Sequence, residues 1–253
     1  MYAEERQAAI VTRARSAGRV EVAELAESFA VTPETVRRDL KALERAGLLR
    51  RVHGGAIVVG LFGFEPALAV REAVHTEAKA QIAEAALAYV PVEGAIALDA
   101  GSSTYQLAER LPTDRALTVV TNSLPIASLL ANRRELTVHL VGGRVRGRTQ
   151  ATVGSVAVDY LRTVGVSVAF LGINGFSVAR GLTTPDSAEA AVKSAMVACS
   201  ATRVLLADSS KFGTSHFARV ADLAEIDVIV TDSTLSDEAA LELEAAGPKV
   251  VRA

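Results

Sequence analysis

Residues 32–47 read TPETVRRDLKALERAG and combine the start of a helix, an apolar stripe and a cationic face. Thr32 suits the N-cap, Pro33 suits the first helical position, and Glu34 is favoured at the positive end of the helix dipole. Gly47 is a typical C-terminal stop. The stripe at helical spacing consists of Val36, Leu40 and Leu43. The stretch therefore predicts a helix with one face that packs and other faces that can meet an anion.

The flanking sequence predicts a helix-turn-helix with a wing. Residues 22–29 form a short amphipathic pattern that is separated from Thr32 by two residues, Ala30 and Val31. Residues 48–56 read as a strand, a Gly-Gly turn and a return strand, and a first helix runs from about residue 2 to residue 16. A cationic helix face alone is usually only solvated, but this combination favours DNA. The predicted DNA contacts are Thr32, Thr35, Arg37, Arg38, Lys41, Arg50, Arg51 and His53.

The first sixty residues resemble the DNA-binding domain of the DeoR family of bacterial transcriptional regulators. The stretches that carry this resemblance are residues 22–29, 35–40, 43–44, 47–49 and 51–56. The resemblance implies a winged helix-turn-helix domain that binds double-stranded operator DNA.

Composition sets limits that agree with this interpretation. The chain has 253 residues, half of them hydrophobic, which is enough for a small domain and a larger one. The net charge is only −2, but cations outnumber acids between Thr32 and His53, so the basic patch is local. The single cysteine, Cys199, and the lack of a signal-like apolar run predict a cytoplasmic protein. The histidines are scattered without the spacing of metal ligands, so no metal site is predicted. The sequence has no nucleotide-binding fingerprint, so no cofactor is predicted either.

A domain boundary is expected near Gly60. We predict a DNA-binding domain over residues 1–59, a linker over 60–74 and a sensor domain over 75–253, with a long helix at 72–89. Beyond it, apolar runs alternate with helical patterns, which predicts a mostly parallel, doubly wound α/β sheet. The expected strands lie near 95–98, 117–120, 137–141, 166–171, 203–207 and 228–230. The expected helices lie near 104–110, 124–131, 156–163, 187–199 and 237–246.

Small polar residues follow five of the predicted strands. The carboxyl ends of parallel strands meet at one edge of a sheet, and ligands bind in the crevice there. A helix that opens with Gly-Ser-Ser-Thr at 101–104 suits an anion such as phosphate. The predicted effector-binding residues are Asp99, Gly101, Ser102, Ser103, Thr104, Thr121, Asn122, Ser123, Gly142, Gly143, Gly172, Lys193, Asp208 and Lys211.

Two of these expectations have alternatives. Lys193 is equally consistent with a solvated helix position. Arg144, Arg146 and Arg148 alternate after Gly143, which places them either at the mouth of the crevice or on a surface that contacts another subunit.

The second part of the chain is similar to the sensor domain of the DeoR family, which in turn resembles ribose-5-phosphate isomerase. The similarity rests on residues 99–104, 121–123, 142–143 and 208–213, and on Glu189 with Lys193. It implies that the domain binds a phosphorylated sugar, with Ser102 to Thr104 matching a phosphate loop. Residues 1–6 and 184–196 are most similar to fructose-operon repressors of actinobacteria, which implies a phosphorylated fructose as effector.

The sequence therefore predicts a transcriptional repressor of a sugar-utilisation operon, a homo-oligomer rather than an enzyme, in which the effector shifts the population between DNA-binding arrangements. The rival is a sugar-phosphate isomerase or deaminase with a DNA-binding appendage, for which Asp99, Glu189 or Asp208 would have to act as a general base. An activator of the same architecture is a third alternative, because the sign of regulation depends on where the operator lies.

Overall fold

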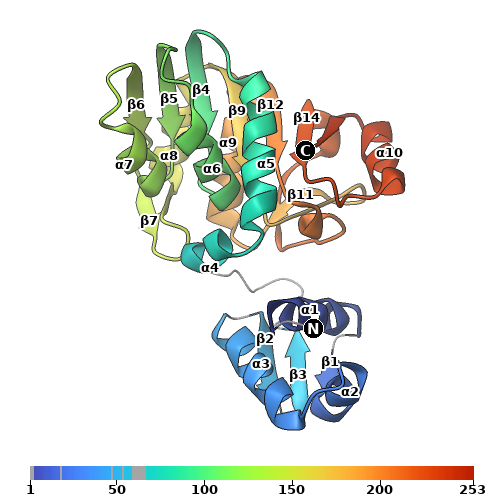
Figure 1. Ribbon diagram of the computed structural model, residues 1–253. Helices are drawn as coiled ribbons and strands as arrows, with labels where there is room; N and C mark the ends of the chain where they lie inside the picture. Colours follow the sequence, from blue (N-terminus) through green and yellow to red (C-terminus); the bar gives the residue numbers. More distant parts are fainter. Residues whose placement is uncertain (1–2, 18, 47, 53, 59–66) are drawn as a thin grey trace. The chain divides into compact units, whose positions relative to one another are not determined.

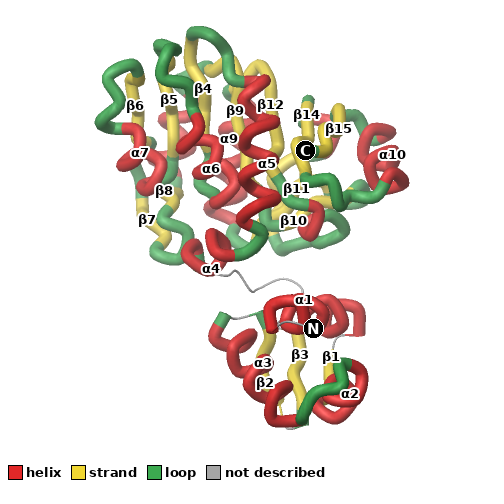
Figure 2. The backbone as a smooth tube through the Cα atoms, viewed as in Figure 1, coloured by secondary structure: helices red, strands yellow, loops and turns green. Residues whose placement is uncertain are grey.

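The computed structural model describes residues 3–17, 19–46, 48–52, 54–58 and 67–253. The chain divides into two compact units, residues 1–66 and 67–253 (Figures 1 and 2). His53 and residues 60–66 of the predicted linker lie outside the described ranges. Among the helices in these ranges, none is long and apolar enough to cross a membrane.

In its described residues, the first unit has three helices and a small antiparallel sheet of strand order β1-β3-β2. Its elements are α1 (Ala3–Ala17), β1 (Arg19–Glu21), α2 (Val22–Ser28), α3 (Pro33–Arg45), β2 (Leu49–Val52) and β3 (Gly55–Val58). The helices α2 and α3 and the wing strands β2 and β3 are where the sequence predicts them. The strand β1 was not predicted. Gly55 permits β1 to join, because a Cβ there would lie 2.0 Å from the Val20 carbonyl oxygen.

The core of the second unit is a sheet of seven parallel strands in the order β15-β14-β12-β9-β4-β5-β6. These strands are β4 (Gly94–Leu98), β5 (Leu117–Thr121), β6 (Leu136–Leu140), β9 (Val166–Gly172), β12 (Ser200–Leu206), β14 (Val228–Thr231) and β15 (Lys249–Arg252). The chain adds strands in one direction from β4 and in the opposite direction from β9. The boundary between β4 and β9 is therefore the topological switch point, where a ligand crevice is expected.

Helices cover both faces of this sheet (Figure 1). One face packs against α5 (Thr76–Ala86), α6 (Ser102–Arg110) and α7 (Leu124–Leu130), and the other packs against α8 (Ser155–Arg162) and α9 (Ser187–Ala198). The helix α10 (Asp237–Ala245) contributes Ala239 and Leu243 to the core on the α8 and α9 side of the sheet. The strands are apolar on both faces, as a parallel sheet covered on both sides requires.

Short strands that the sequence did not predict follow β6, β9 and β12, and short 3-10 turns occur elsewhere in the unit. The hairpin of β7 (Arg144–Arg146) and β8 (Ala151–Val153) follows β6. A second antiparallel sheet contains β10 (Gly175–Ser177), β11 (Gly181–Thr184) and β13 (Ala218–Ala221). Single 3-10 turns occur at η1 (Leu87–Tyr89), η2 (Ser209–Lys211) and η3 (Leu223–Glu225).

The helix predicted over residues 72–89 is wrong as a single element. The structure has α4 (Leu68–Ala73), a break, α5 and then η1. Val74 is extended and His75 has a φ of 55°, in the left-handed region, so the chain turns between the two helices. The second unit begins at residue 67, so α4 occupies part of the range 60–74 that the sequence predicts as linker. Figure 1 shows α4 at the edge of the sheet where β4 ends.

Candidate functional sites

The start of α3 has the capping geometry that its sequence predicts. The Thr32 side chain is the N-cap and its Oγ1 accepts a hydrogen bond from the Thr35 N–H, with an N···O distance of 3.2 Å. Pro33 occupies the first turn. The apolar stripe of α3 is buried against α1 and α2, and consists of Val36, Leu40 and Leu43. The packing of this stripe leaves the opposite side of α3 exposed.

An ion pair fixes α3 to α1. The Arg6 guanidinium donates to both carboxylate oxygens of Asp39, with Nε···Oδ2 and Nη2···Oδ1 distances of 2.6 and 3.2 Å. Gln7 donates to the same carboxylate at 3.0 Å. The pair is buried, and its hydrogen bonds raise the pKa of Arg6 above its ordinary value. Asp39 therefore belongs to the interior of the unit, although the two residues before it are surface arginines.

The exposed side of α3 carries cations, some of which form an ion pair within the protein and some of which do not. Arg38 and Lys41 are exposed, and the structure gives neither an ion pair among the residues it describes. Arg37 forms an exposed pair with Glu34 at 3.2 Å, of the kind worth about 0–1 kcal/mol, so it is readily exchanged for a phosphate. Arg38, Lys41 and Arg45, which is likewise exposed and has no ion pair among the described residues, therefore need no rearrangement to contact an anion.

The wing carries one positioned arginine. Arg51 donates from Nε to a Glu44 carboxylate oxygen at 2.7 Å, and its main-chain N–H donates to the other oxygen at 2.9 Å. These hydrogen bonds lower the pKa of Glu44 below its ordinary value. The side chain of Arg50 and the whole of His53 lie outside the described part of the chain, so their predicted roles stay predictions.

A buried ion pair lies at the switch point of the large sheet. Asp99 follows β4, is inaccessible to solvent, and accepts a hydrogen bond from the Gly172 N–H at 2.9 Å and another from the Lys193 ammonium. Lys193 also donates to the Gly172 carbonyl at 3.0 Å. Burial raises the pKa of Asp99, and the Lys193 charge opposes that rise. The solvated alternative for Lys193 is therefore wrong, because only 3% of this residue is exposed.

The loop after β5 holds the loop after β4. The Asn122 side chain accepts from the Ala100 N–H at 2.9 Å and donates to the Thr152 carbonyl at 3.3 Å. The Thr121 hydroxyl donates to the Leu98 carbonyl at 2.6 Å and accepts from the Ser123 N–H at 3.1 Å. The polar side chains of this loop are buried and engaged with the main chain, so they determine the shape of the crevice.

The start of α6 presents its serines differently from its threonine. The Thr104 hydroxyl donates to the carbonyls of Asp99 and Gly101, at 2.6 and 2.9 Å. Ser102 and Ser103 are nearly buried, and the structure gives their hydroxyls no hydrogen bond to the residues it describes. These hydroxyls and the first N–H groups of the helix are available to an anion.

A cluster of cations at the same sheet edge was not predicted as a whole. Lys79 of α5 is 3% exposed, and its pKa is lowered to about 8, first by burial and then by the charge of Lys211. Arg71 of α4 lowers this pKa further, whereas Asp208 raises it. Lys211 donates to the Ile173 carbonyl at 3.1 Å and lies 3.9 Å from an Asp208 carboxylate oxygen. We refer to Arg71, Lys79 and Lys211 as the cationic cluster.

Sequence reasoning found Lys211 and Asp208 but missed Lys79 and Arg71. A lysine in an Ala-rich helix is typical of a solvated face, and only the packing of α5 against its neighbours shows that Lys79 is buried. Arg71 lies before the helix predicted over residues 72–89, and the break that brings it near Lys79 was not predicted.

The hairpin β7/β8 is anchored to α9 by a second ion-pair network. Arg146 pairs with Glu189 and, at 3.2 Å, with Asp186. The Thr149 hydroxyl donates to Glu189 at 2.5 Å. Arg146 therefore points inward, while Arg144 and Arg148 are exposed. Gly143 is required here, since its φ is 138° and a Cβ would lie 2.7 Å from a main-chain oxygen of β8.

All three carboxylates that an enzyme would need as a base are engaged. Asp99 holds Lys193, Glu189 holds Arg146, and Asp208 accepts a hydrogen bond from the Ser210 hydroxyl. A general base must reach the proton that it removes, and a carboxylate that already accepts charge-assisted hydrogen bonds is a poor base. Both hydrogen bonds to Asp99 go to Oδ2, whereas its Oδ1 is buried and has no hydrogen-bond partner among the described residues. For Glu189 and Asp208 the geometry therefore suits binding better than proton transfer.

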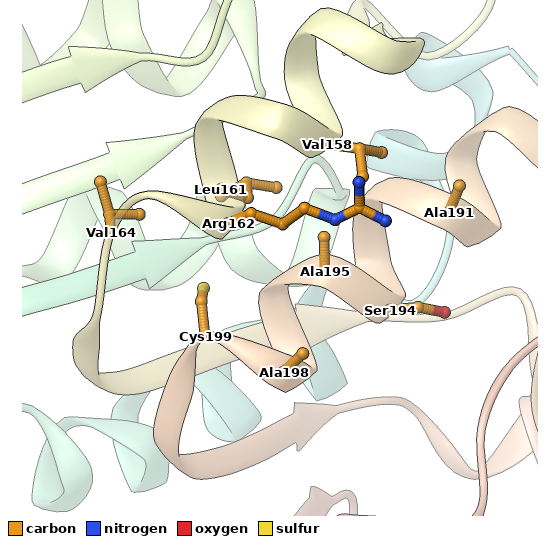
Figure 3. A pocket seen from close by; sticks show the side chains of 9 residues that line it. All are labelled: Val158, Leu161, Arg162, Val164, Ala191, Ser194, Ala195, Ala198 and Cys199. Atoms are coloured by element: carbon orange, nitrogen blue, oxygen red, sulfur yellow. The ribbon is translucent and has the colours of Figure 1, made fainter.

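A separate groove of about 570 Å3 lies between α8 and α9, away from these polar loops (Figure 3). Small residues of α9 form one wall, and the Arg162 side chain of α8 extends across the groove. Arg162 pairs with Asp159 at 3.1 Å, and both side chains are mostly exposed. The groove lacks the convergent polar groups that a sugar phosphate requires.

The two units together define a class of protein: a winged helix-turn-helix with an exposed cationic helix, followed by a ligand-sensing α/β unit. Residues 6–60 match the DeoR-like helix-turn-helix domain, and residues 74–233 match the DeoR C terminal sensor domain. The chain belongs to the DeoR family of transcriptional regulators.

Relatives extend over the full length of the chain. The HTH-type transcriptional regulator GlpR of Haloferax volcanii is 37% identical over 99% of this chain and 98% of its own. The glycerol-3-phosphate regulon repressor of Escherichia coli is 29% identical, and the match covers 90% of each chain. Among solved structures, ribose 5-phosphate isomerase A from Methanocaldococcus jannaschii is 16% identical with a TM-score of 0.42, over 55% of each chain.

Proposed function

We propose that this regulator represses a sugar-utilisation operon and that a phosphorylated sugar, bound at the carboxyl-end edge of the large sheet, controls it. The observation that carries this proposal is the cationic cluster, which lies at the same edge as the start of α6. Three cations against one buried carboxylate suit an anion with two charges. The E. coli relative named for a glycerol 3-phosphate regulon supports a phosphorylated effector and a repressor.

Within this site we assign the phosphate to Lys211, Lys79, Arg71 and the hydroxyls of Ser102 and Ser103. The other predicted effector residues play a supporting part, because Asp99, Thr104, Thr121, Asn122 and Lys193 already form hydrogen bonds inside the protein. They hold the loops that surround the ligand. Phosphorylated fructose stays a prediction of the sequence and is one of the ligands to test.

On the DNA side, we propose that Arg38 and Lys41 lead the contact with DNA, with Thr32, Thr35, Arg37 and Arg51 beside them. One winged unit makes few base contacts, so a symmetric homo-oligomer that binds related half-sites is expected. Light scattering of the purified chain, together with footprinting on DNA selected from a random pool, tests this. A monomer that protects a single half-site at full affinity would contradict it.

Thermal melting with a panel of ligands tests the effector. Fructose 1-phosphate, fructose 6-phosphate, glycerol 3-phosphate and ribose 5-phosphate are compared with unphosphorylated fructose as the control. A ligand at a hundred times its Kd stabilises the folded state by about 2.7 kcal/mol. We expect a shift with at least one phosphate ester, no shift with fructose, and a change in DNA affinity in a gel-shift assay with the same ester. Turnover of a sugar phosphate that depends on Asp99 or Asp208 would favour the enzyme instead.

A further inference from the structure

The short helix α4 is fastened to the sensor unit at both of its ends. At its start, the Leu68 N–H donates to the carbonyl of Arg148, in the turn between β7 and β8, at 2.9 Å. At its end, the buried Lys79 ammonium donates to the carbonyls of Arg71 and Val74. The last carbonyls of a helix have no partner within it, so Lys79 supplies a C-terminal cap from another helix. The attachment of α4 therefore depends on a member of the cationic cluster.

Arg71 gives α4 a second link to this cluster. Its Nε and Nη2 atoms are shielded from solvent and have no acceptor among the described residues. A buried donor without an acceptor is costly, and an arginine does not lose its charge to escape that cost. The Lys79 ammonium donates to the Arg71 carbonyl, so the two cationic residues are in contact, and the Arg71 charge lowers the pKa of Lys79. Without an anion, the cluster therefore works against the docking of α4.

We propose that an anion bound in the cationic cluster fastens α4 to the sensor unit, and that α4 thereby transmits ligand occupancy toward the DNA-binding unit. This inference rests on the proposed function of the cluster as the phosphate site. The anion offers the Arg71 donors an acceptor and offsets the repulsion among the cations. Lys79 has three N–H donors, so it can contact the anion and still cap α4.

The position of α4 in the chain gives this attachment its consequence. It is the first element of the second unit, directly after the residues that lead from the DNA-binding unit. A change in the stability of the α4 attachment therefore acts on the part of the chain that connects the two units. The hairpin β7/β8 takes part, because its turn holds the start of α4 while Arg146 ties the hairpin to α9.

Hydrogen exchange of the full-length protein tests the proposal with fructose 1-phosphate and inorganic phosphate as probes. Calorimetry first establishes saturation. We expect the main-chain amides of residues 70–74 to exchange at least tenfold more slowly in the saturated protein, while those of α10, at residues 237–245, do not change. Saturation that leaves the exchange of α4 unchanged overturns the proposal.

A variant tests the same proposal without any ligand. Arg71→Met keeps an unbranched apolar stem and removes the unsatisfied donors, so α4 should exchange about 5–30-fold more slowly in the empty protein. Arg134→Met is the matched control, because Arg134 is exposed and far along the chain from α4. Equal exchange of α4 in Arg71→Met and wild type overturns the proposal. If neither probe binds, the phosphate assignment loses its support while this comparison still decides the role of Arg71.

Discussion

Arg6 and Asp39 form a buried ion pair between α1 and α3, with an Nε···Oδ2 distance of 2.6 Å. Asp39 lies one residue after Arg38, yet the two side chains serve opposite faces of the helix: one fixes the helix to its unit and the other is exposed. The position of the cationic face therefore depends on an ion pair that is itself buried inside the unit.

Loss of this pair should unfold the small unit more readily than loss of a surface charge. Asp39→Ala leaves the Arg6 charge buried and unpaired, which should lower the stability of the DNA-binding unit by about 3–5 kcal/mol. Calorimetry of the full chain should show the loss in the transition of that unit. The double variant Arg6→Met/Asp39→Ala should recover part of it, and a single variant as stable as wild type would contradict the structural role.

Arg38→Ala should weaken DNA binding without destabilising the protein, because Arg38 is exposed. If the side chain reads a base edge, the loss should be about 1–3 kcal/mol and should depend on the sequence. If it meets a phosphate, affinity should fall uniformly and the salt dependence should lose about one unit of slope. Gel shifts at several salt concentrations distinguish the two. A folded Arg37→Ala/Arg38→Ala protein with wild-type affinity would remove α3 from the interface.

Ser103→Asp should abolish the response to effector while DNA binding persists. Aspartate places a negative charge where the start of α6 would receive the phosphate, and the main-chain donors there would be occupied by the new carboxylate. Ser103→Ala is the matched control, since it removes the hydroxyl without adding charge and should weaken binding only modestly. A wild-type change in DNA affinity with the same phosphate ester in the aspartate variant would place the phosphate elsewhere.

Affinity for the phosphate ester should fall as the pH rises through about 8. The pKa of Lys79 is lowered from 10.5 to about 8, first by burial, and a bound anion should raise it again. Ligand binding then takes up a proton above pH 8, which weakens affinity by up to tenfold per pH unit. The charged groups that influence Lys79 are Lys211, Asp208, Arg71 and Glu72.

The same group predicts how stability varies with pH in the empty protein. A lysine with a lowered pKa in the folded state costs stability below that pKa, and the cost disappears as the pH rises from about 8 to 10.5. Lys79→Met should flatten the pH dependence of phosphate-ester affinity and the pH dependence of stability in this window. Calorimetric titrations between pH 7 and 9.5 measure the first, and a pH-independent affinity in the wild type would exclude Lys79 from the site.

Local signals in the sequence were sufficient for the recognition helix and for six of the seven strands of the large sheet, whereas the edge strand β15 was not predicted. Thr32 and Pro33 determine a helix start from neighbouring residues alone, and the apolar runs of β4 and β9 are long enough to indicate buried strands. Three-residue strands such as β7 and β8 have too little periodicity to predict. The pairing that forms them depends on Gly143 and on contacts with α9 that the sequence does not reveal.

The break between α4 and α5 shows why part of the candidate site escaped prediction. Val74 and His75 are compatible with a helix by propensity, but at the turn the Lys79 ammonium donates to the carbonyls of Arg71 and Val74. A tertiary interaction therefore overrides the local preference. Lys79 and Arg71 became neighbours through that same turn, so the position of the cationic cluster was hidden together with the break.

The hydrogen bond from the Gly172 N–H to Asp99 joins the two halves of the large sheet where the chain reverses its order of strands. Asp99 thus links the ends of β4 and β9 and also lies beside the expected ligand crevice. In a genetic screen, substitutions at Asp99, Gly172 or Lys193 would relieve repression by depleting the regulator, whereas substitutions at Ser103 would leave its abundance intact. Immunoblots of such mutants would separate the two groups, and only the second would report on signalling.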